Sequence, residues 1–313
     1  MSYNLPLEEA KMERIVTTVI DREKCIGCGL CVKVCPSRTI TMQDDKAMVT
    51  GTTSLSCGHC AAVCPADAVR VNAIDAGTSL FNTFYGDDAW LPHGDYDTVR
   101  LVRLMGSRRS CRNYLDGPVS RVLLEDLVKI GITAPSGTNS QLWTFTLLPT
   151  RKEVLAFGDR IAAFFRKLNR MSENRYVRGF LKLVGRAEMD TYYREYHDSV
   201  EEALTEWEQL GVDRLFHGAT AAIIVGSEPG ASCPREDALL ATQNILLAAH
   251  SVGLGSCLIG FAVEAMKRDI TIKRFLGIPD SEKVYAVIAL GYPDEQYLRV
   301  TGRKKYVQRY FDA

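Results

Sequence analysis

The cysteines in the first quarter of the chain are spaced like ligands of iron-sulfur clusters. The run Cys25–Pro36 reads Cys-x2-Cys-x2-Cys-x3-Cys-Pro, a pattern in which three close thiolates bind one cluster and the fourth reaches a second cluster. A later run, Cys57–Pro65, repeats part of this spacing, which indicates an internal duplication. Ser54 stands where the repeat predicts a further cysteine.

The duplication predicts which cysteines share a cluster, because each half lends its last cysteine to the cluster of the other half. We expect one site to hold a 4Fe-4S cluster. The other site has no fourth cysteine, so we expect a 3Fe-4S cluster or a 4Fe-4S cluster completed by Ser54, water or an outside ligand. The predicted ligands are Cys25, Cys28, Cys31 and Cys64 for the first site, and Cys35, Cys57 and Cys60 for the second.

Zinc is the main alternative, because Cys-x2-Cys pairs also bind zinc. A zinc site needs neither the third close cysteine nor the prolines that follow Cys35 and Cys64, so the pattern favours iron-sulfur clusters. A disulfide scaffold would need an oxidising compartment, whereas residues 1–18 carry scattered charges and no apolar core of a signal peptide. We therefore expect a reducing, cytoplasmic location.

Composition limits the partners. The chain has 313 residues, of which 46% are hydrophobic, enough for about two domains with cores. Lysine plus arginine equals aspartate plus glutamate at 38 each, so no net field favours nucleic acid. The uncharged stretch 245–263 contains a histidine and three glycines, which predicts a buried helix and a glycine-rich loop rather than a membrane span. We expect no nucleic-acid or membrane partner.

The hydrophobic pattern divides the chain into a cysteine-bearing domain (1–75), a linker (76–97) and a second domain (98–313) with a helical cover at about 150–215. In the second domain, strands predicted at 143–148, 219–225 and 284–291 alternate with helices, which favours an α+β sandwich. We expect the aromatic residues of the linker to pack on a protein surface: Phe81, Phe84, Tyr85 and Trp90.

Four motifs follow one another in the second domain: Arg108-Arg109-Ser110-x-Arg112; Ala134-Pro135-Ser136-Gly137-x-Asn139-x-Gln141-x-Trp143; Gly253-Leu254-Gly255 running to Ile259-Gly260; and Leu290-Gly291-Tyr292-Pro293. Their order and spacing resemble those of the FMN-dependent nitroreductase family. With the cysteine-bearing domain in front, the chain resembles the ferredoxin-nitroreductase fusions of anaerobes. This resemblance implies a bacterial ferredoxin-like domain, a nitroreductase-type α+β sandwich, FMN as a cofactor and a homodimer.

The resemblance also implies the FMN contacts. The first motif binds the phosphate and the pyrimidine side of the ring, the Pro-Ser loop comes from the other subunit, the glycine-rich turn offers an N–H to flavin N5, and a basic pair near the C-terminus closes on the phosphate. In that order the residues are Arg108, Arg109, Ser110 and Arg112; Pro135, Ser136, Gly137 and Asn139; Ile259 and Gly260; Arg303 and Lys305. Leu142 departs from the family pattern, where proline is usual.

The segment 150–215 carries no motif. Its charges are typical of solvated surface helices, and the other interpretation is a cover over the flavin that shapes a substrate pocket. Under the second interpretation, Tyr193, Tyr196 and His197 are candidate proton donors.

We expect an iron-sulfur flavoprotein oxidoreductase. Electrons from ferredoxin or another low-potential donor would pass through the clusters to FMN and on to an electron-poor small molecule, such as a nitroaromatic, a quinone or an activated alkene. The alternatives are an electron-transfer module that reduces a protein partner, and a relative of reductive dehalogenases. A relative that consumes flavin with oxygen is disfavoured, because oxygen attacks the clusters.

Overall fold

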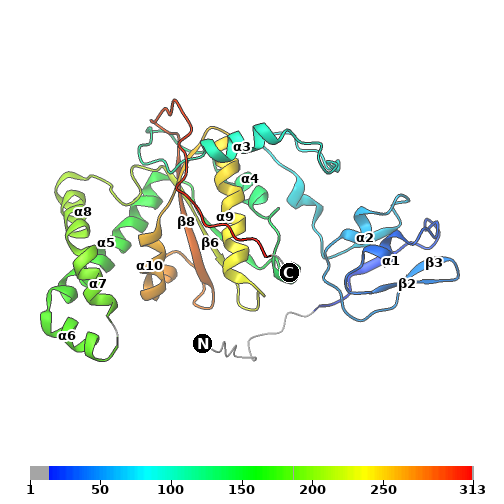
Figure 1. Ribbon diagram of the computed structural model, residues 1–313, viewed down its shortest axis with the longest axis horizontal. Helices are drawn as coiled ribbons and strands as arrows, with labels where there is room; N and C mark the ends of the chain where they lie inside the picture. Colours follow the sequence, from blue (N-terminus) through cyan, green and yellow to red (C-terminus); the bar gives the residue numbers. More distant parts are fainter. Residues whose placement is uncertain (1–13, 186, 312–313) are drawn as a thin grey trace.

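The computed structural model describes residues 14–185 and 187–311. The first 13 residues of the predicted domain 1–75 therefore lie outside the described residues. A small N-terminal part and a larger α+β part are joined by an extended segment (Figure 1). Among the described residues, no helix is both long and apolar enough to cross a lipid bilayer.

The N-terminal part consists of two short antiparallel sheets and two short helices. Strand β1 pairs with β4 and strand β2 pairs with β3, so the first strand of the unit is joined to its last. Asp44 and Asp45 form the turn between β2 and β3, with both residues at positive φ, 48° and 58°. The elements are β1 (Thr18–Ile20), α1 (Leu30–Val34), β2 (Ile40–Gln43), β3 (Lys46–Val49), α2 (His59–Ala62) and β4 (Val69–Val71).

The core of this part is small, and three of its buried members are the cysteines Cys25, Cys31 and Cys60. A core of this size stabilises a domain weakly, so bound metal normally supplies part of the folding free energy in such units.

A four-stranded antiparallel sheet of order β5-β6-β8-β7 forms the centre of the larger part. Its strands are β5 (Trp143–Leu148), β6 (Ala221–Ser227), β7 (Gly255–Leu258) and β8 (Lys283–Gly291). Every residue of β6 is buried, and successive side chains point to opposite faces. Ile223 and Val225 enter the core on one face, and Ala222 and Ile224 enter the core on the other, so the sheet is covered on both sides.

Helices α4 and α9 cover one face of the sheet, and α5 and α10 cover the other (Figure 1). The predicted cover consists of α5 to α8, which extend beyond α10. The helices are η1 (Ala76–Ser79), α3 (Thr98–Ser107), α4 (Arg121–Gly131), η2 (Gly137–Asn139), α5 (Arg151–Glu173), α6 (Arg175–Leu183), α7 (Glu188–Glu195), α8 (His197–Leu210), α9 (Pro234–Ser251), α10 (Gly260–Arg268) and α11 (Ile270–Phe275).

The glycine-rich segment after α9 differs from the prediction of a loop, because it contains strand β7. The sequence Gly-Ser-Cys-Leu has little apolar alternation, and the strand forms because β8 offers it an open edge, with Ser256 opposite Leu290 and Leu258 opposite Ile288. This strand positions the residues that follow it.

The linker is attached to helix α4 by hydrogen bonds, whereas two of its aromatic side chains point into solvent. Asp126 of α4 is fully buried and accepts hydrogen bonds from the backbone N–H groups of Asn82 and Thr83 at 2.9 and 2.7 Å. The expectation for Tyr85 and Trp90 is wrong within the described chain, because these side chains are 93% and 78% exposed. Large apolar surface left exposed in this way indicates a surface that another molecule can cover.

Candidate functional site

The structure brings the seven cysteines of the N-terminal part to two cavities. Cys25, Cys28, Cys31 and Cys64 line one cavity, together with Ala47 of β3; we call them the outer cysteine set. Cys35, Cys57 and Cys60 line the second cavity, together with Ser54. We call the three cysteines the inner cysteine set.

Backbone N–H groups point at several of these sulfur atoms. Ala68 N–H donates to Cys64 Sγ at 3.2 Å, and Thr39 N–H donates to Cys35 Sγ at 3.3 Å. The hydrogen bond from Ala47 N–H lowers the pKa of Cys25. The thiolate is the form that binds metal, so the donor set fits iron-sulfur clusters. Within residues 14–185 and 187–311, no three Cys, His, Asp or Glu side chains gather closely enough for a single metal ion.

Ser54 lies at the inner cavity, where the repeat lacks its cysteine. Its Oγ accepts a hydrogen bond from Ser56 N–H at 3.0 Å, which fixes the side chain in a local turn. Hydroxyl oxygen is a harder donor than thiolate, so the inner set offers iron three soft ligands and one poor one.

A basic cavity of about 430 Å³ lies beside the start of β7. Arg103, Arg108, Arg109 and Arg299 line it together with Glu295, and Arg303 lies near Arg108. Burial and the neighbouring cations Arg303 and Arg109 lower the pKa of Arg108. Like charges repel, so a cluster of this kind fits a bound dianion such as a phosphate group.

The arginines are positioned by β7. After α3 ends at Ser107, the motif runs beside β7, where Ser110 forms a parallel bridge with Ser256 and Cys111 N–H donates to Ser256 O at 3.0 Å. Arg112 then enters a second, larger cavity at the far side of β7. Residues of one strand therefore line both cavities, Gly255 and Ser256 the basic one and Cys257 and Leu258 the larger one.

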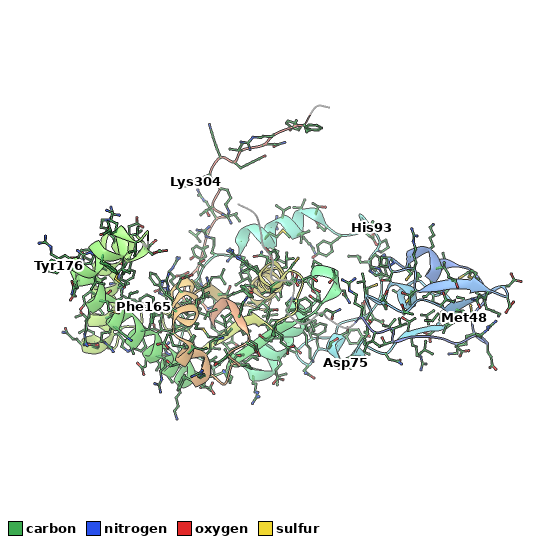
Figure 2. The ribbon with its side chains drawn as sticks, turned by 90° about the horizontal axis from the view of Figure 1, so that it is seen from below. Met48, Asp75, His93, Phe165, Tyr176 and Lys304 are labelled. Carbon is green, nitrogen blue, oxygen red and sulfur yellow. The ribbon has the colours of Figure 1, made fainter. Side chains whose placement is uncertain are left out.

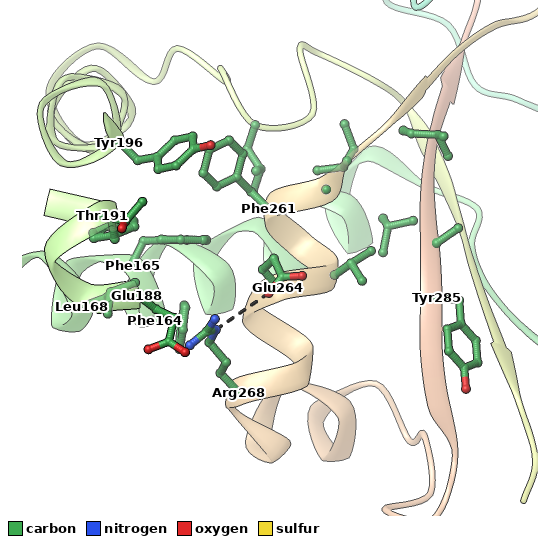
Figure 3. A pocket seen from close by; sticks show the side chains of 18 of the residues that line it. Phe164, Phe165, Leu168, Glu188, Thr191, Tyr196, Phe261, Glu264, Arg268 and Tyr285 are labelled. Carbon is green, nitrogen blue, oxygen red and sulfur yellow. Dashed lines mark ion pairs between the residues drawn. The ribbon is translucent and has the colours of Figure 1, made fainter. Parts of the chain in front are cut away.

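The larger cavity has a volume of about 1270 Å³ and lies between β7, the start of α10 and the helical cover. Ile259 and Gly260 line it where β7 turns into α10. Aromatic rings close the opposite side (Figure 3): Phe261 contacts Phe165 edge-on at 5.4 Å and Tyr196 at 6.1 Å between ring centroids. Such a cavity can hold a flat ring system.

The Pro-Ser loop, residues 135–141, lies elsewhere. It precedes β5, whereas Ile259 and Gly260 follow β7, and these strands form the two opposite edges of the sheet. The loop is attached to α9, because Gly137 N–H donates to Asp237 Oδ1 at 2.8 Å. Ser136 Oγ accepts a hydrogen bond from Gln141 N–H at 3.1 Å, which closes the loop on itself. Within one chain, the structure therefore does not bring the loop to the residues at β7.

The predicted basic pair near the C-terminus is Arg303 and Lys305. Both side chains are exposed on the tail, and Arg303 lies near Arg108, whose pKa it lowers. The tail leaves the body of the protein near Lys304 (Figure 2).

Residues 105–292, more than half of the chain, match the model of the nitroreductase family, and residues 18–41 match that of the 4Fe-4S binding domain. This chain belongs to the nitroreductase family. Its nitroreductase domain is preceded by a 4Fe-4S ferredoxin domain, which is the fusion that the sequence predicts.

The chain is similar to a protein of Methanothermobacter thermautotrophicus named "Putative NADH dehydrogenase/NAD(P)H nitroreductase". The two are 46% identical over 209 residues, which is 64% of this chain and 82% of the relative. Ferredoxin-2 of Desulfomicrobium norvegicum is 47% identical over 32 residues, 10% of this chain and 54% of that ferredoxin. A nitroreductase of Bacteroides fragilis, solved with bound FMN, superposes with a TM-score of 0.48 at 24% identity, covering 66% of this chain and 94% of that one.

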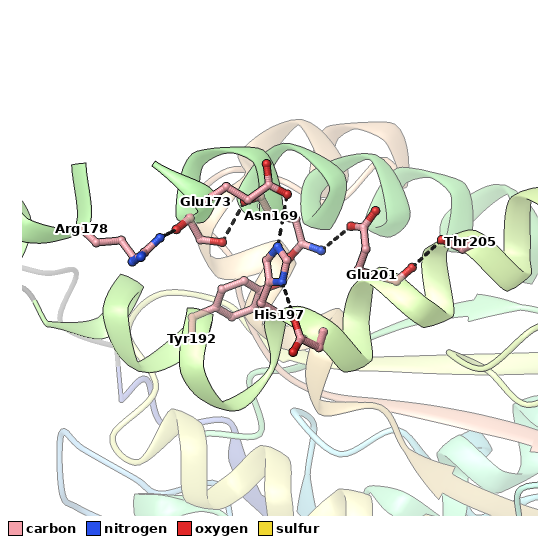
Figure 4. Close-up of polar contacts among 9 residues, drawn as sticks. Asn169, Glu173, Arg178, Tyr192, His197, Glu201 and Thr205 are labelled. Atoms are coloured by element: carbon pink, nitrogen blue, oxygen red, sulfur yellow. Dashed lines mark hydrogen bonds and ion pairs between the residues drawn. The ribbon is translucent and has the colours of Figure 1, made fainter. Parts of the chain in front are cut away.

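In the present chain, the three candidate proton donors Tyr193, Tyr196 and His197 have different surroundings. Tyr196 lines the large cavity. His197 is buried between carboxylates (Figure 4), with its ring nitrogens 2.9 Å from Asp198 Oδ1 and 3.3 Å from Glu173 Oε1. The hydrogen bond to Asp198, followed by that to Glu173, raises the pKa of His197. Tyr193 lies beneath the guanidinium of Arg178, at 3.8 Å.

Sequence reasoning missed two residues of this nitroreductase site. Phe261 forms the aromatic wall from the first turn of α10, and its position directly after Gly260 is the only local signal. Glu295 accepts hydrogen bonds from Arg112 N–H at 3.2 Å and from Asn113 Nδ2 at 2.7 Å, which fixes the end of the arginine motif. Its position two residues after Pro293 of the fourth motif could have marked it.

Proposed function

We propose that this protein is an iron-sulfur flavoprotein that reduces electron-poor small molecules with low-potential electrons. In this proposal residues 1–75 bind two iron-sulfur clusters, 76–97 form a linker, and 98–313 bind one FMN. The observation that carries the proposal is that the basic cavity and the large aromatic cavity are lined by successive residues of β7, in a chain that also has a 4Fe-4S domain. When bound, FMN supplies the ability to accept single electrons and to pass two to a substrate.

Arg108, Arg109 and Arg303 would hold the FMN phosphate, because their positive charges cluster at and beside the basic cavity. Gly260 would donate to the flavin ring. Ile259 N–H already donates to Val287 O at 2.9 Å, whereas Gly260 N–H belongs to the first turn of α10, where N–H groups have no intrahelical acceptor. Arg112 would face the pyrimidine side from the large cavity.

The substrate would lie between the flavin and the cover. Phe165, Tyr196 and Phe261 present rings on that side of the cavity, and offset or edge-on contacts with such rings favour flat, electron-poor molecules. Nitroaromatics, quinones and activated alkenes share this chemistry. Tyr196 is the proton-donor candidate that reaches the cavity.

The protein would act as a homodimer. Two copies are needed because the 135–141 loop and the Ile259–Gly260 turn lie at opposite sheet edges within one chain. The linker and the tail also leave large apolar side chains exposed, among them Trp90 at 78%, Leu298 at 95% and Phe311 at 92%. A second copy that covers them would remove this apolar surface from water.

The proposal places the protein in the cytoplasm, because iron-bound thiolates need a reducing compartment. Ferredoxin or another low-potential donor would reduce the cluster held by the outer cysteine set, whose Cys28 is exposed. The name of the Methanothermobacter relative instead points to a nicotinamide donor for that protein.

The test compares Cys28→Ala with Cys233→Ala, an exposed cysteine outside both sets. Both proteins are purified without oxygen, and their iron, sulfide and flavin contents are measured. Cys28→Ala should keep its FMN but lose the bleaching of flavin absorbance by reduced ferredoxin, and Cys233→Ala should behave like the natural protein. Zinc in place of iron, or unchanged bleaching in Cys28→Ala, would contradict the proposal.

The alternative is a module that passes electrons to a protein partner. A flavin closed off from small molecules would favour that function, and the cavity of about 1270 Å³ argues against it. Turnover of a nitroaromatic, an enone and a halogenated aromatic with the same donor separates the two functions and also tests a dehalogenase-like activity.

A further inference from the structure

The ferredoxin domain contacts the nitroreductase domain at the inner cysteine set. The side-chain amide of Asn139, in the 135–141 loop, donates to the carbonyl oxygens of Leu55 at 2.9 Å and of Ser56 at 3.4 Å. Leu55 and Ser56 line the inner cavity, directly before Cys57. Gln141 Nε2 donates to Asn139 Oδ1 at 2.9 Å and orients the amide group. Both ends of the Asn139 side chain are therefore engaged within the chain.

The outer cysteine set lies at the other end of the ferredoxin domain. Ala47 of β3 lines its cavity, and the β2–β3 hairpin forms the end of the domain that points away from the sheet (Figure 1). Met48, the next residue of β3, lies at that outer end in a second view (Figure 2). The inner set is thus the one that meets the nitroreductase domain.

The 135–141 loop, which contacts Leu55 beside the inner cysteine set, lies at the opposite edge of the sheet from the proposed FMN site of its own chain. It precedes β5, and the Ile259–Gly260 turn follows β7, with β6 and β8 between them. At about 4.8 Å per strand spacing, the two edges are about 14 Å apart before any side chain is counted. In the homodimer proposed above, a second copy can bring its own β7 edge to this loop.

We infer that the inner cysteine set serves the FMN of the second copy, and that Asn139 is the positioning residue that holds it there. This inference rests on the proposed function. With clusters and FMN bound, each transfer would move one electron from the cluster held by the inner set to the FMN of the other subunit. Two transfers, with protons from solvent, would reduce one FMN, and the low-potential donor would restore both electrons to the inner cluster through the cluster held by the outer set.

Mixed dimers with two different affinity tags test which of the two FMN molecules receives electrons from a given inner site. The two lesions are Arg108→Ala, which weakens FMN binding and is used after free FMN has been removed so that this subunit holds none, and Cys57→Ala, which removes the inner site. In the crossed dimer, each subunit carries one lesion. In the matched control, one subunit carries both lesions and the other carries neither. Each dimer holds one FMN and one intact inner site, and the readout is the bleaching of flavin absorbance after reduced ferredoxin is added, with no substrate present.

We expect bleaching in the crossed dimer, where the intact inner site faces the remaining FMN, and at least tenfold slower bleaching in the control. The reverse result would show that each inner site serves its own chain and would overturn the inference. Equal bleaching in both dimers, or in neither, would also overturn it. If the natural homodimer itself fails to bleach, the proposed function fails instead, so the two failures are distinguishable.

Asn139→Leu tests the positioning role. Losing a hydrogen bond of this kind costs about 1 kcal/mol, which corresponds to roughly fivefold slower bleaching if docking limits the transfer. Its iron content, FMN content and melting temperature should stay unchanged. Ser232→Ala is the control, because it removes a hydrogen bond to Thr138 in the same loop without touching the ferredoxin domain. Loss of FMN from Asn139→Leu with a normal bleaching rate would make Asn139 a flavin ligand and contradict the role assigned to it.

Discussion

Gly255 lies so close to Cys111 that a Cβ atom at residue 255 would stand 2.8 Å from Cys111 Sγ. The contact joins β7 to the arginine motif, and Cys111 N–H also donates to Ser256 O. The spacing between the basic cavity and the large cavity therefore depends on the absence of a side chain at one position of β7.

Gly255→Ala should displace the arginine motif. The cost of an added methyl group in a packed region is about 1–3 kcal/mol, and part of it should appear as at least fivefold weaker FMN binding. Flavin fluorescence on titration of the apoprotein measures this. Gly302→Ala, at a glycine with open space around its Cβ position, is the control. Normal FMN affinity in Gly255→Ala would show that the motif tolerates the shift.

Arg108→Ala should release FMN and leave the clusters in place. A charge-assisted hydrogen bond to phosphate contributes about 1.5–3 kcal/mol, so FMN affinity should fall by roughly tenfold to a hundredfold. Arg100→Ala, which removes an exposed arginine of α3, is the matched control and should keep its FMN. The absorbance spectra of cluster and flavin report both outcomes, and an unchanged flavin content in Arg108→Ala would remove Arg108 from the site.

The inner site should be convertible between 3Fe-4S and 4Fe-4S forms, because Ser54 offers a hydroxyl where a thiolate is expected. Electron paramagnetic resonance of the oxidised natural protein should show a 3Fe-4S signal that diminishes when iron is added under reducing conditions. Ser54→Cys should abolish this signal by completing the ligand set. Two complete 4Fe-4S clusters in Ser54→Ala would refute the prediction.

Dilution should remove FMN and dissociate the proposed homodimer together. If the 135–141 loop of one copy covers the FMN of the other, a separated chain leaves the ring open to water on one side. Sedimentation velocity with detection at a flavin wavelength follows both quantities. A stable monomer that retains FMN would exclude the shared site.

The helical cover should loosen as pH rises. The pKa of His197 is raised by Asp198 and Glu173, so the charged ring stabilises the cover fully below the unfolded value of about 6.5 and loses this effect as pH rises through the folded pKa. We expect a loss of about 1 kcal/mol, seen as faster hydrogen exchange in α8 at pH 9 than at pH 6 after correction for the intrinsic rate. His197→Gln should remove the difference, and an equal pH effect in that variant would assign it to another group.

Local chemistry made much of this protein predictable. Cysteine spacing is set by the size of a cluster, so the sequence was enough to predict the 4Fe-4S domain. The order of four short motifs was enough to predict the nitroreductase family. The strand at Trp143–Leu148 was also predictable from its own run of residues, although it pairs with β6 in the fold.

Only the tertiary structure decided which distant groups meet. Strand β7 exists because β8 offers it an edge, and Phe261 becomes an aromatic wall because α10 turns it toward the cover. The family resemblance nominates Asn139 as a flavin contact, and the folded chain also brings its amide to the carbonyl oxygen of Leu55, more than eighty residues away along the chain. Such pairings depend on strand order and domain placement, which no local pattern encodes because the free energy that selects them comes from the burial of whole surfaces.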